Sequence, residues 1–254
     1  MNAALLLPWA FSVLLLSVRL SVAVALSPAL SSYGVPAVVR VALTIALALL
    51  TFANLAPLPA ASDWLATPGS MLAPVLAEVF IGALLGLGVH VLLAAFSLAG
   101  RLMDVQIGFA IGSVFDPVTR TSANILGSLL SLIGVALFVI SNAHLELARL
   151  VASSIDLLPL GEMPALNNPL QPLLAAGSMF ALGLAFAGPV VAALLLTDVA
   201  IAVTSRNMPQ LNVLVLAIPV KVIVAYLVLS IAVVSWGPLL QQALGQTLRL
   251  LETR

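Results

Sequence analysis

Long apolar runs separated by short polar breaks dominate the hydrophobic pattern of this chain. Six runs approach the ~20 residues that a membrane-spanning helix needs. They lie near residues 9–27, 37–56, 71–100, 121–141, 173–203 and 211–235. Pro189 inside the fifth run predicts a kink. The pattern therefore predicts an all-α membrane protein with about six long hydrophobic helices, some of them kinked.

Two segments are amphipathic rather than uniformly apolar. Residues 143–158 carry charged side chains among leucines, and Asn142 precedes them as a candidate N-cap. Residues 238–254 have a similar pattern, so we expect this tail to lie along a surface or a partner. The first run has no basic residue before Arg19, which favours an uncleaved first helix over a cleaved signal peptide. With no internal repeat or linker, the chain is expected to form one domain.

Composition supports the membrane interpretation and excludes several kinds of chemistry. Hydrophobic residues make up 63% of the chain and charged residues only 7%, which no soluble domain of this size matches. The net charge is zero, so nothing points to nucleic acid. The chain has no cysteine and only two distant histidines, and it lacks P-loop and GxSxG motifs. Disulfides, thiolate metal sites and cysteine nucleophiles are therefore excluded, a membrane-embedded hydrolase is disfavoured, and no cofactor is expected.

Single charged residues stand deep inside four of the apolar runs: Arg19, Glu78, Asp198 and Lys221. Each would cost about 2.5–3.5 kcal/mol at a lipid-facing helix centre, so they must face protein or water. If the last two runs form a hairpin that turns near Met208, Asp198 and Lys221 differ in depth by about 4–5 Å. A buried ion pair between these two is then possible, and separate interfacial charges are the alternative.

The polar break between the last two runs reads SRNMPQLN. Arg206, Asn207 and Pro209 are ordinary helix-stop residues: a cation at the helix C-terminus, an asparagine for the left-handed position, and a proline that prevents continuation. Gln210 and Asn212 are not needed for that stop. Their amides suit a turn that is buried in protein, where backbone groups need partners.

The segment between the third and fourth runs is apolar, although it separates two helices. It reads GRLMDVQIGFAIGSVFDPVTR over residues 100–120. Asp116 followed by Pro117 is a helix-start signal, so a helix is expected from Pro117 onward. An apolar loop before that helix either packs in a core or plugs an opening, and the residues by themselves favour core packing.

Two stretches of the chain resemble the FliR family of bacterial type III export-gate proteins, whose injectisome members are called SctT. They read GRLMDVQIGFAIGSVFDP and VVAALLLTDVAIAVTSRNMPQLNVLVLAIPVK. The second is the more specific, and the resemblance extends over nearly the whole chain. It implies a non-enzymatic structural and gating subunit of the flagellar export channel. An injectisome subunit of the same family is the alternative.

The resemblance also implies partners and an architecture. Family members assemble with FliP, FliQ and FlhB into the entrance of the channel through which unfolded export substrates pass. The complex is helical and pseudo-symmetric, belongs to the basal body in the bacterial inner membrane, and is raised toward the periplasmic side. This chain would fuse a P-like part, roughly 1–170, with a Q-like hairpin, roughly 171–254.

By the same resemblance, the segment matching 106–116 projects into the lumen as a plug, which replaces the core-packing interpretation. Bulky apolar side chains between glycine hinges exclude water without a salt bridge that must break. The expected plug residues are Ile107, Gly108, Phe109, Ala110, Ile111, Gly112, Ser113, Val114 and Phe115. Its base is expected to be held by Asp104, Gln106, Asp116 and Pro117. The break at 206–212 would form the turn of the hairpin and contact partner subunits.

A secondary transporter with broken helices is the alternative from another class of protein. Charges inside apolar runs, at Glu78, Asp198 and Lys221, together with Pro189 and Pro219 fit the physics of such transporters. That class predicts inverted repeats, which the sequence does not contain.

Overall fold

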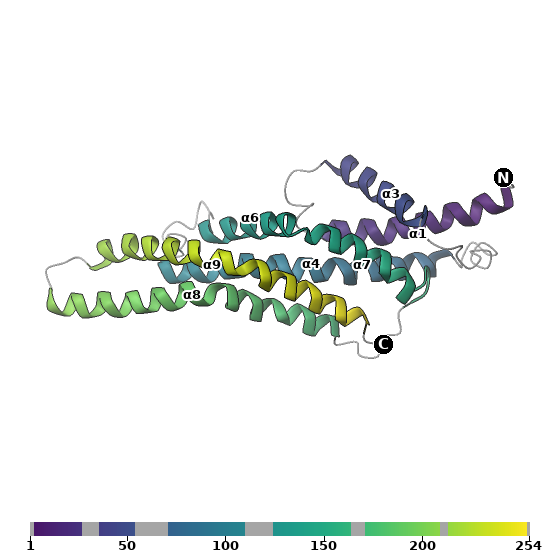
Figure 1. The fold of residues 1–254 in the computed structure, drawn as a ribbon. Helices are drawn as coiled ribbons and strands as arrows, with labels where there is room; N and C mark the ends of the chain where they lie inside the picture. Colours follow the sequence, from purple (N-terminus) through teal and green to yellow (C-terminus); the bar gives the residue numbers. More distant parts are fainter. Residues whose placement is uncertain are drawn as a thin grey trace. The chain divides into compact units, whose positions relative to one another are not determined.

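The computed structural model describes residues 3–26, 36–53, 71–109, 124–163, 171–208 and 213–252 (Figure 1). Within these ranges the chain is helical and has no strand. The helices are α1 (Ala3–Leu26), α3 (Ala37–Ala53), α4 (Leu72–Ile107), α6 (Ile125–Ile140), α7 (Ala143–Leu157), α8 (Gln171–Asn207) and α9 (Val213–Glu252). The all-α membrane class predicted from the apolar pattern is confirmed.

Each of the six apolar runs corresponds to a helix. Within the described residues, four helical segments are long and apolar enough to cross a membrane: Trp9–Leu26, Leu72–Ile107, Gly177–Asn207 and Leu216–Leu239. The helices α3 and α6 are apolar but shorter. Helices are the expected solution because a backbone in lipid must satisfy its polar groups internally.

Prolines inside the last two helices do not end them. Pro189 lies within α8, and both Pro219 and Pro238 lie within α9. Membrane helices tolerate proline because neighbouring groups satisfy the carbonyls that it frees. The amphipathic tail predicted from residue 238 is consequently the last part of α9, which runs without a break to Glu252.

The start of one helix and the capping of another differ from the sequence predictions. The helix α6 begins at Ile125 with Asn124 as its N-cap, eight residues after the start predicted at Pro117. The helix α7 does follow Asn142, but Asn142 has a left-handed backbone (φ 57°) and its side chain makes no capping hydrogen bond. Asparagine tolerates that conformation better than most residues. It therefore serves to turn the chain between α6 and α7.

The chain divides into two compact units, the first comprising Met1–His90, Asn142–Ala176 and Leu244–Arg254. Aliphatic side chains of α1, α3, α4, α7 and the turn after α7 form its core: Leu16, Leu20, Ala23, Ala48, Ile81, Leu85, Val151, Ile155 and Leu160. The helices α1 and α4 approach closely at Gly82, where a Cβ atom would lie 2.5 Å from the carbonyl oxygen of Arg19. Only glycine fits at such a distance, as in other membrane helix pairs.

The second unit comprises Val91–Ser141 and Gly177–Ala243. Three aromatic rings from α4, α8 and α9 meet in its core. The ring of Phe96 stacks on that of Phe186 with centroids 4.4 Å apart, and Trp236 lies 5.7 Å and 5.3 Å from them. Such pairs contribute about 0.5–1.5 kcal/mol each beyond the area that they bury. This cluster fixes the three helices from which the polar groups described below project.

Candidate gating segment and its polar anchors

The helix α4 ends in a Schellman motif directly before the apolar segment that the sequence singles out. Gly108 has a φ of 102°, in the region that favours glycine. The N–H of Phe109 donates to the carbonyl of Asp104 (3.0 Å), and the N–H of Gly108 donates to that of Val105 (3.2 Å). These are the two hydrogen bonds that define the motif. Gly108, predicted to be a hinge, is thus the residue at which the helix stops and the chain turns.

Asp104 caps α6 from the last turn of α4. Its buried carboxylate accepts the N–H of Leu126 on Oδ1 and the N–H of Gly127 on Oδ2, each at 3.0 Å. N–H groups in the first turn of a helix lack an intrahelical acceptor, and a carboxylate there also faces the positive end of the helix dipole. Asn124, the N-cap by position, supplies no side-chain hydrogen bond. Asp104 therefore ties the end of α4 to the start of α6.

A ring of three polar residues joins α4, α8 and α9. The Nζ of Lys221 lies 2.5 Å from Oδ1 of Asp198 and donates to the backbone carbonyl of Gln106 at 3.1 Å. The Nε2 of Gln106 in turn donates to Oδ2 of Asp198 at 3.1 Å. The Gln106 carbonyl belongs to the last turn of α4, where carbonyls lack intrahelical donors and a cation is favourable.

The ion pair suggested by the hairpin arithmetic is confirmed, but it is less enclosed than expected. The side chain of Asp198 is 38% exposed and that of Lys221 is 15% exposed within this chain. Half-buried groups of this kind remain available to a neighbour. Arg206 and Asn207, at the end of α8, are exposed. Pro209, Gln210 and Asn212 lie outside the described residues.

These polar anchors bracket the predicted plug. Ile107 is the last residue of α4 and its side chain is buried, so it belongs to the helix and the core rather than to the loop in which the sequence placed it. Phe109 is partly buried. The other predicted plug and base residues lie outside the described residues: Ala110, Ile111, Gly112, Ser113, Val114, Phe115, Asp116 and Pro117.

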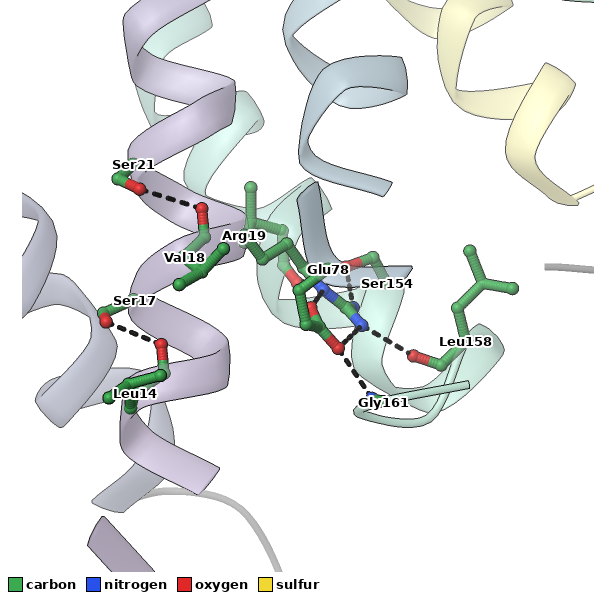
Figure 2. Close-up of polar contacts among 10 residues, drawn as sticks. Leu14, Ser17, Val18, Arg19, Ser21, Glu78, Ser154, Leu158 and Gly161 are labelled. Carbon is green, nitrogen blue, oxygen red and sulfur yellow. Dashed lines mark hydrogen bonds and ion pairs between the residues drawn. The ribbon is translucent and has the colours of Figure 1, made fainter. Parts of the chain in front are cut away.

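In the first unit, Arg19 and Glu78 form an ion pair with both side chains 0% exposed (Figure 2). The guanidinium Nε lies 2.5 Å from one carboxylate oxygen, and Nη2 lies 3.0 Å from the other. The guanidinium also donates to Oγ of Ser154 (2.9 Å) and to the carbonyl of Leu158 (3.1 Å). The N–H of Gly161 donates to the Glu78 carboxylate at 2.7 Å. The network joins α1, α4, α7 and the turn that follows α7.

The prediction that Arg19 and Glu78 face protein or water is confirmed, but their pairing was not predicted. They lie 59 residues apart in different apolar runs, so no spacing rule relates them. The available signal was weaker: two opposite charges, each alone in its run. A buried pair offsets its desolvation only when further hydrogen bonds complete both groups. The contacts to Ser154, Leu158 and Gly161 provide them.

The fold and these contacts define a class: an all-α membrane protein whose intramembrane charges are bonded to one another and to helix ends. Among the described residues, no group of three His, Cys, Asp or Glu side chains could hold a metal ion. The described networks of Asp104, of Lys221 and of Arg19 join helices.

Residues 10–247 match the family described as "Bacterial export proteins, family 1", and the chain belongs to that family. It is similar to the flagellar biosynthetic protein FliR of Bacillus subtilis, with 29% identity over 222 residues, 86% of this chain and 84% of the relative. Escherichia coli FliR is 27% identical over 242 residues, 92% of this chain and 88% of the relative. The secretion system apparatus protein SsaT of Salmonella typhimurium is 27% identical over 165 residues, 64% of each chain. The resemblance to the FliR and SctT family is therefore confirmed.

Proposed function

We propose that this chain is a structural and gating subunit of the flagellar type III protein export channel, and that the segment after α4 is its plug. Membership of the bacterial export proteins and similarity to flagellar FliR proteins support the export function. One observation supports the gating role: hydrogen bonds and an ion pair fix the end of α4 before the segment, and Asp104 ties that end to the start of α6. Asp104 and the Gln106–Asp198–Lys221 ring are those anchors.

In the proposed gate, the anchors hold the helices in place and the apolar segment forms the seal. The anchors use charges and helix ends, and their side chains belong to α4, α8 and α9. The segment from Phe109 to Phe115 carries apolar side chains and small residues. Apolar side chains block ions by excluding water, and a passing polypeptide displaces them without breaking a salt bridge. The segment can therefore change position while α4 and α6 keep their register.

FliP-, FliQ- and FlhB-type subunits are the proposed partners, and unfolded export substrates are the proposed cargo. Exposed apolar side chains on α8 and α9 support this proposal, among them Leu196, Val199, Ile231 and Val234. Apolar faces of that kind are covered either by lipid or by other subunits. We place the chain in the bacterial inner membrane within the basal body, raised toward the periplasmic side. Its division into a P-like part and a Q-like hairpin belongs to the same proposal.

An injectisome subunit of the same family is the second candidate, because SsaT is named as a secretion system protein. A transporter site fits the structure less well. Asp198 and Lys221 are occupied by each other and by Gln106, and Glu78 is enclosed with Arg19. A substrate would have to displace these partners.

The experiment that tests the proposal is co-expression with the P-type and Q-type subunits of the same genome, followed by detergent purification and native mass spectrometry. We expect a discrete hetero-oligomer that contains this chain. A chain that stays monomeric or forms only homodimers beside both partners would overturn the proposal. Partners from flagellar and injectisome operons, tested in parallel, distinguish the two systems.

A further inference from the structure

A cavity of about 340 Å³ lies within the first unit, where α3 packs against α1. Its lining comes from the last turns of α1 and the first turns of α3: Ser21, Val22, Val24, Ala25, Ala37, Arg40, Val41 and Thr44. Its volume falls within the range of small-molecule sites, about 300–1,000 Å³. The two hydroxyl groups donate to their own helices, Ser21 to the carbonyl of Val18 and Thr44 to that of Val41. The guanidinium of Arg40 is therefore the group that can bind a ligand.

Arg40 lacks the partners that Arg19 has. Its Nε is buried, and among the described residues it is the only buried side-chain nitrogen or oxygen without a hydrogen bond. Arg19, by contrast, bonds a carboxylate, a hydroxyl and a carbonyl. Natural proteins rarely leave a buried donor on a charged group unsatisfied, because the lost hydration is not replaced. An anion would supply the acceptor that this N–H lacks and would also neutralise the charge.

The position of Arg40 within its own helix is electrostatically unfavourable. Arg40 lies in the first turn of α3, which begins at Ala37. The positive end of a helix dipole repels a cation in the first turn and attracts an anion. The helix end and the guanidinium therefore act in the same direction, and both favour a negatively charged ligand.

The level of the cavity along α1 limits the identity of that ligand. The apolar span of α1 is Trp9–Leu26, and the cavity is lined by residues in its last turns, up to Ala25. The end of an apolar span marks the membrane–water interface, where arginine reaches the headgroups. On α3, the exposed side chains near Arg40 are also apolar, including Val38, Val41 and Ile45. An anion bound at this level would lie next to apolar side chains of both helices, which suits the acyl chain of a lipid.

We propose that this cavity binds one anionic phospholipid, with Arg40 holding its phosphate and the apolar lining holding the upper part of an acyl chain. A guanidinium matches a phosphate with two parallel hydrogen bonds. Free phosphate has nothing to place against Val22, Val24 and Ala25. The proposal does not depend on the gating function, since none of its residues belongs to the anchors or the plug.

The experiment is native mass spectrometry of the full chain in detergent, titrated with phosphatidylglycerol or phosphatidylcholine. We expect one retained phosphatidylglycerol per chain, and about a tenfold loss of its affinity in Arg40→Gln, the size of one charge-assisted contact. Arg40→Lys should keep part of the affinity. Arg101→Gln removes an exposed arginine of the second unit and serves as the matched control, with affinity unchanged.

A second variant keeps the test meaningful if Arg40→Gln fails to fold. Ala25→Phe fills the apolar end of the cavity with Arg40 intact, and it should also release the lipid. Equal phosphatidylglycerol binding by wild type and both variants would overturn the proposal. So would equal affinity for phosphatidylcholine, or complete competition by inorganic phosphate. In the co-expressed complex, a photo-crosslinker at Val41 should capture lipid, and capture of a protein carboxylate segment instead would reassign Arg40 to a subunit contact.

Discussion

The Oδ1 atom of Asp104 accepts the backbone N–H of Leu126 at 3.0 Å, so the last turn of α4 supplies the cap for the first turn of α6. The bond spans 22 residues, and the chain between the two groups contains the proposed plug. One carboxylate thus fixes both the exit from one helix and the entry into the next.

Removing this carboxylate should destabilise the second unit. Asp104→Ala leaves two buried N–H groups without acceptors, and we expect a loss of about 2–4 kcal/mol in the free energy of unfolding. Asp104→Asn keeps one acceptor oxygen and should lose roughly half as much. Denaturant titration in mixed micelles measures both. Asp156→Ala, at an exposed carboxylate of α7, is the control and should change little; equal stability of Asp104→Ala and this control would remove the capping role.

The groups around the Arg19–Glu78 ion pair suit a cation at residue 19 and an anion at residue 78, and not the reverse. Arg19 faces two acceptors, the Ser154 hydroxyl and the Leu158 carbonyl, whereas Glu78 faces a donor, the Gly161 N–H. Removing either partner should cost about 3–5 kcal/mol. The exchanged pair, Arg19→Glu with Glu78→Arg, should fail to restore stability, because its carboxylate would face the Leu158 carbonyl and its guanidinium the Gly161 N–H. Recovery of wild-type stability by the exchange would show that the pair acts through charge alone.

The Asp198–Lys221 pair should show measurable but modest coupling. Both groups are partly exposed, so a double-mutant cycle with alanine should give a coupling energy of about 0.5–1 kcal/mol. The same cycle for Asp198 and the exposed Arg206 provides the baseline and should be additive. Thermal unfolding of the four proteins in micelles gives the numbers. Additivity in both cycles would mean that the ion pair contributes nothing to stability in the folded chain.

Gly108 should be costly to replace because of its backbone conformation. An L-residue at a φ of 102° is strained, and we expect Gly108→Ala to lose about 1–2 kcal/mol in unfolding free energy. Gly177 lies in α8 and a Cβ there meets nothing within 4 Å. Gly177→Ala should therefore be neutral or stabilising by up to about 1 kcal/mol. The opposite ranking in a denaturant titration would exclude Gly108 as the stop of α4.

The gating proposal predicts an ion leak when the seal becomes polar. Phe109→Asp places a charge at the first residue of the apolar segment, and we expect ion conductance of the assembled complex in planar bilayers to rise at least about tenfold, because water enters a polar constriction. Phe109→Leu keeps the apolar character and serves as the control. An assembled Phe109→Asp complex as tight as wild type would place Phe109 in the core instead.

The apolar pattern was enough to predict the helices, because a backbone in lipid has few alternatives to a helix. The pairing of Asp198 with Lys221 could also be predicted, since both residues flank one hairpin. The partner of Arg19 could not be predicted, because a contact across 59 residues depends on how helices pack. The start of α6 was missed for a related reason: its cap comes from Asp104 on another helix, and the local Asp-Pro signal at residue 116 carries no information about that contact.

The Arg19–Glu78 pair also has a consequence for biosynthesis. The ribosome adds Arg19 to the chain 59 residues before Glu78, a delay of about 3–12 s at bacterial rates of synthesis. During that interval Arg19 would cost about 2.5–3.5 kcal/mol if its helix moved freely into lipid. We expect α1 to stay beside the insertion machinery until α4 arrives, and to be released only when Gly161 completes the network. The order in which this protein enters the membrane is thus set by a single arginine.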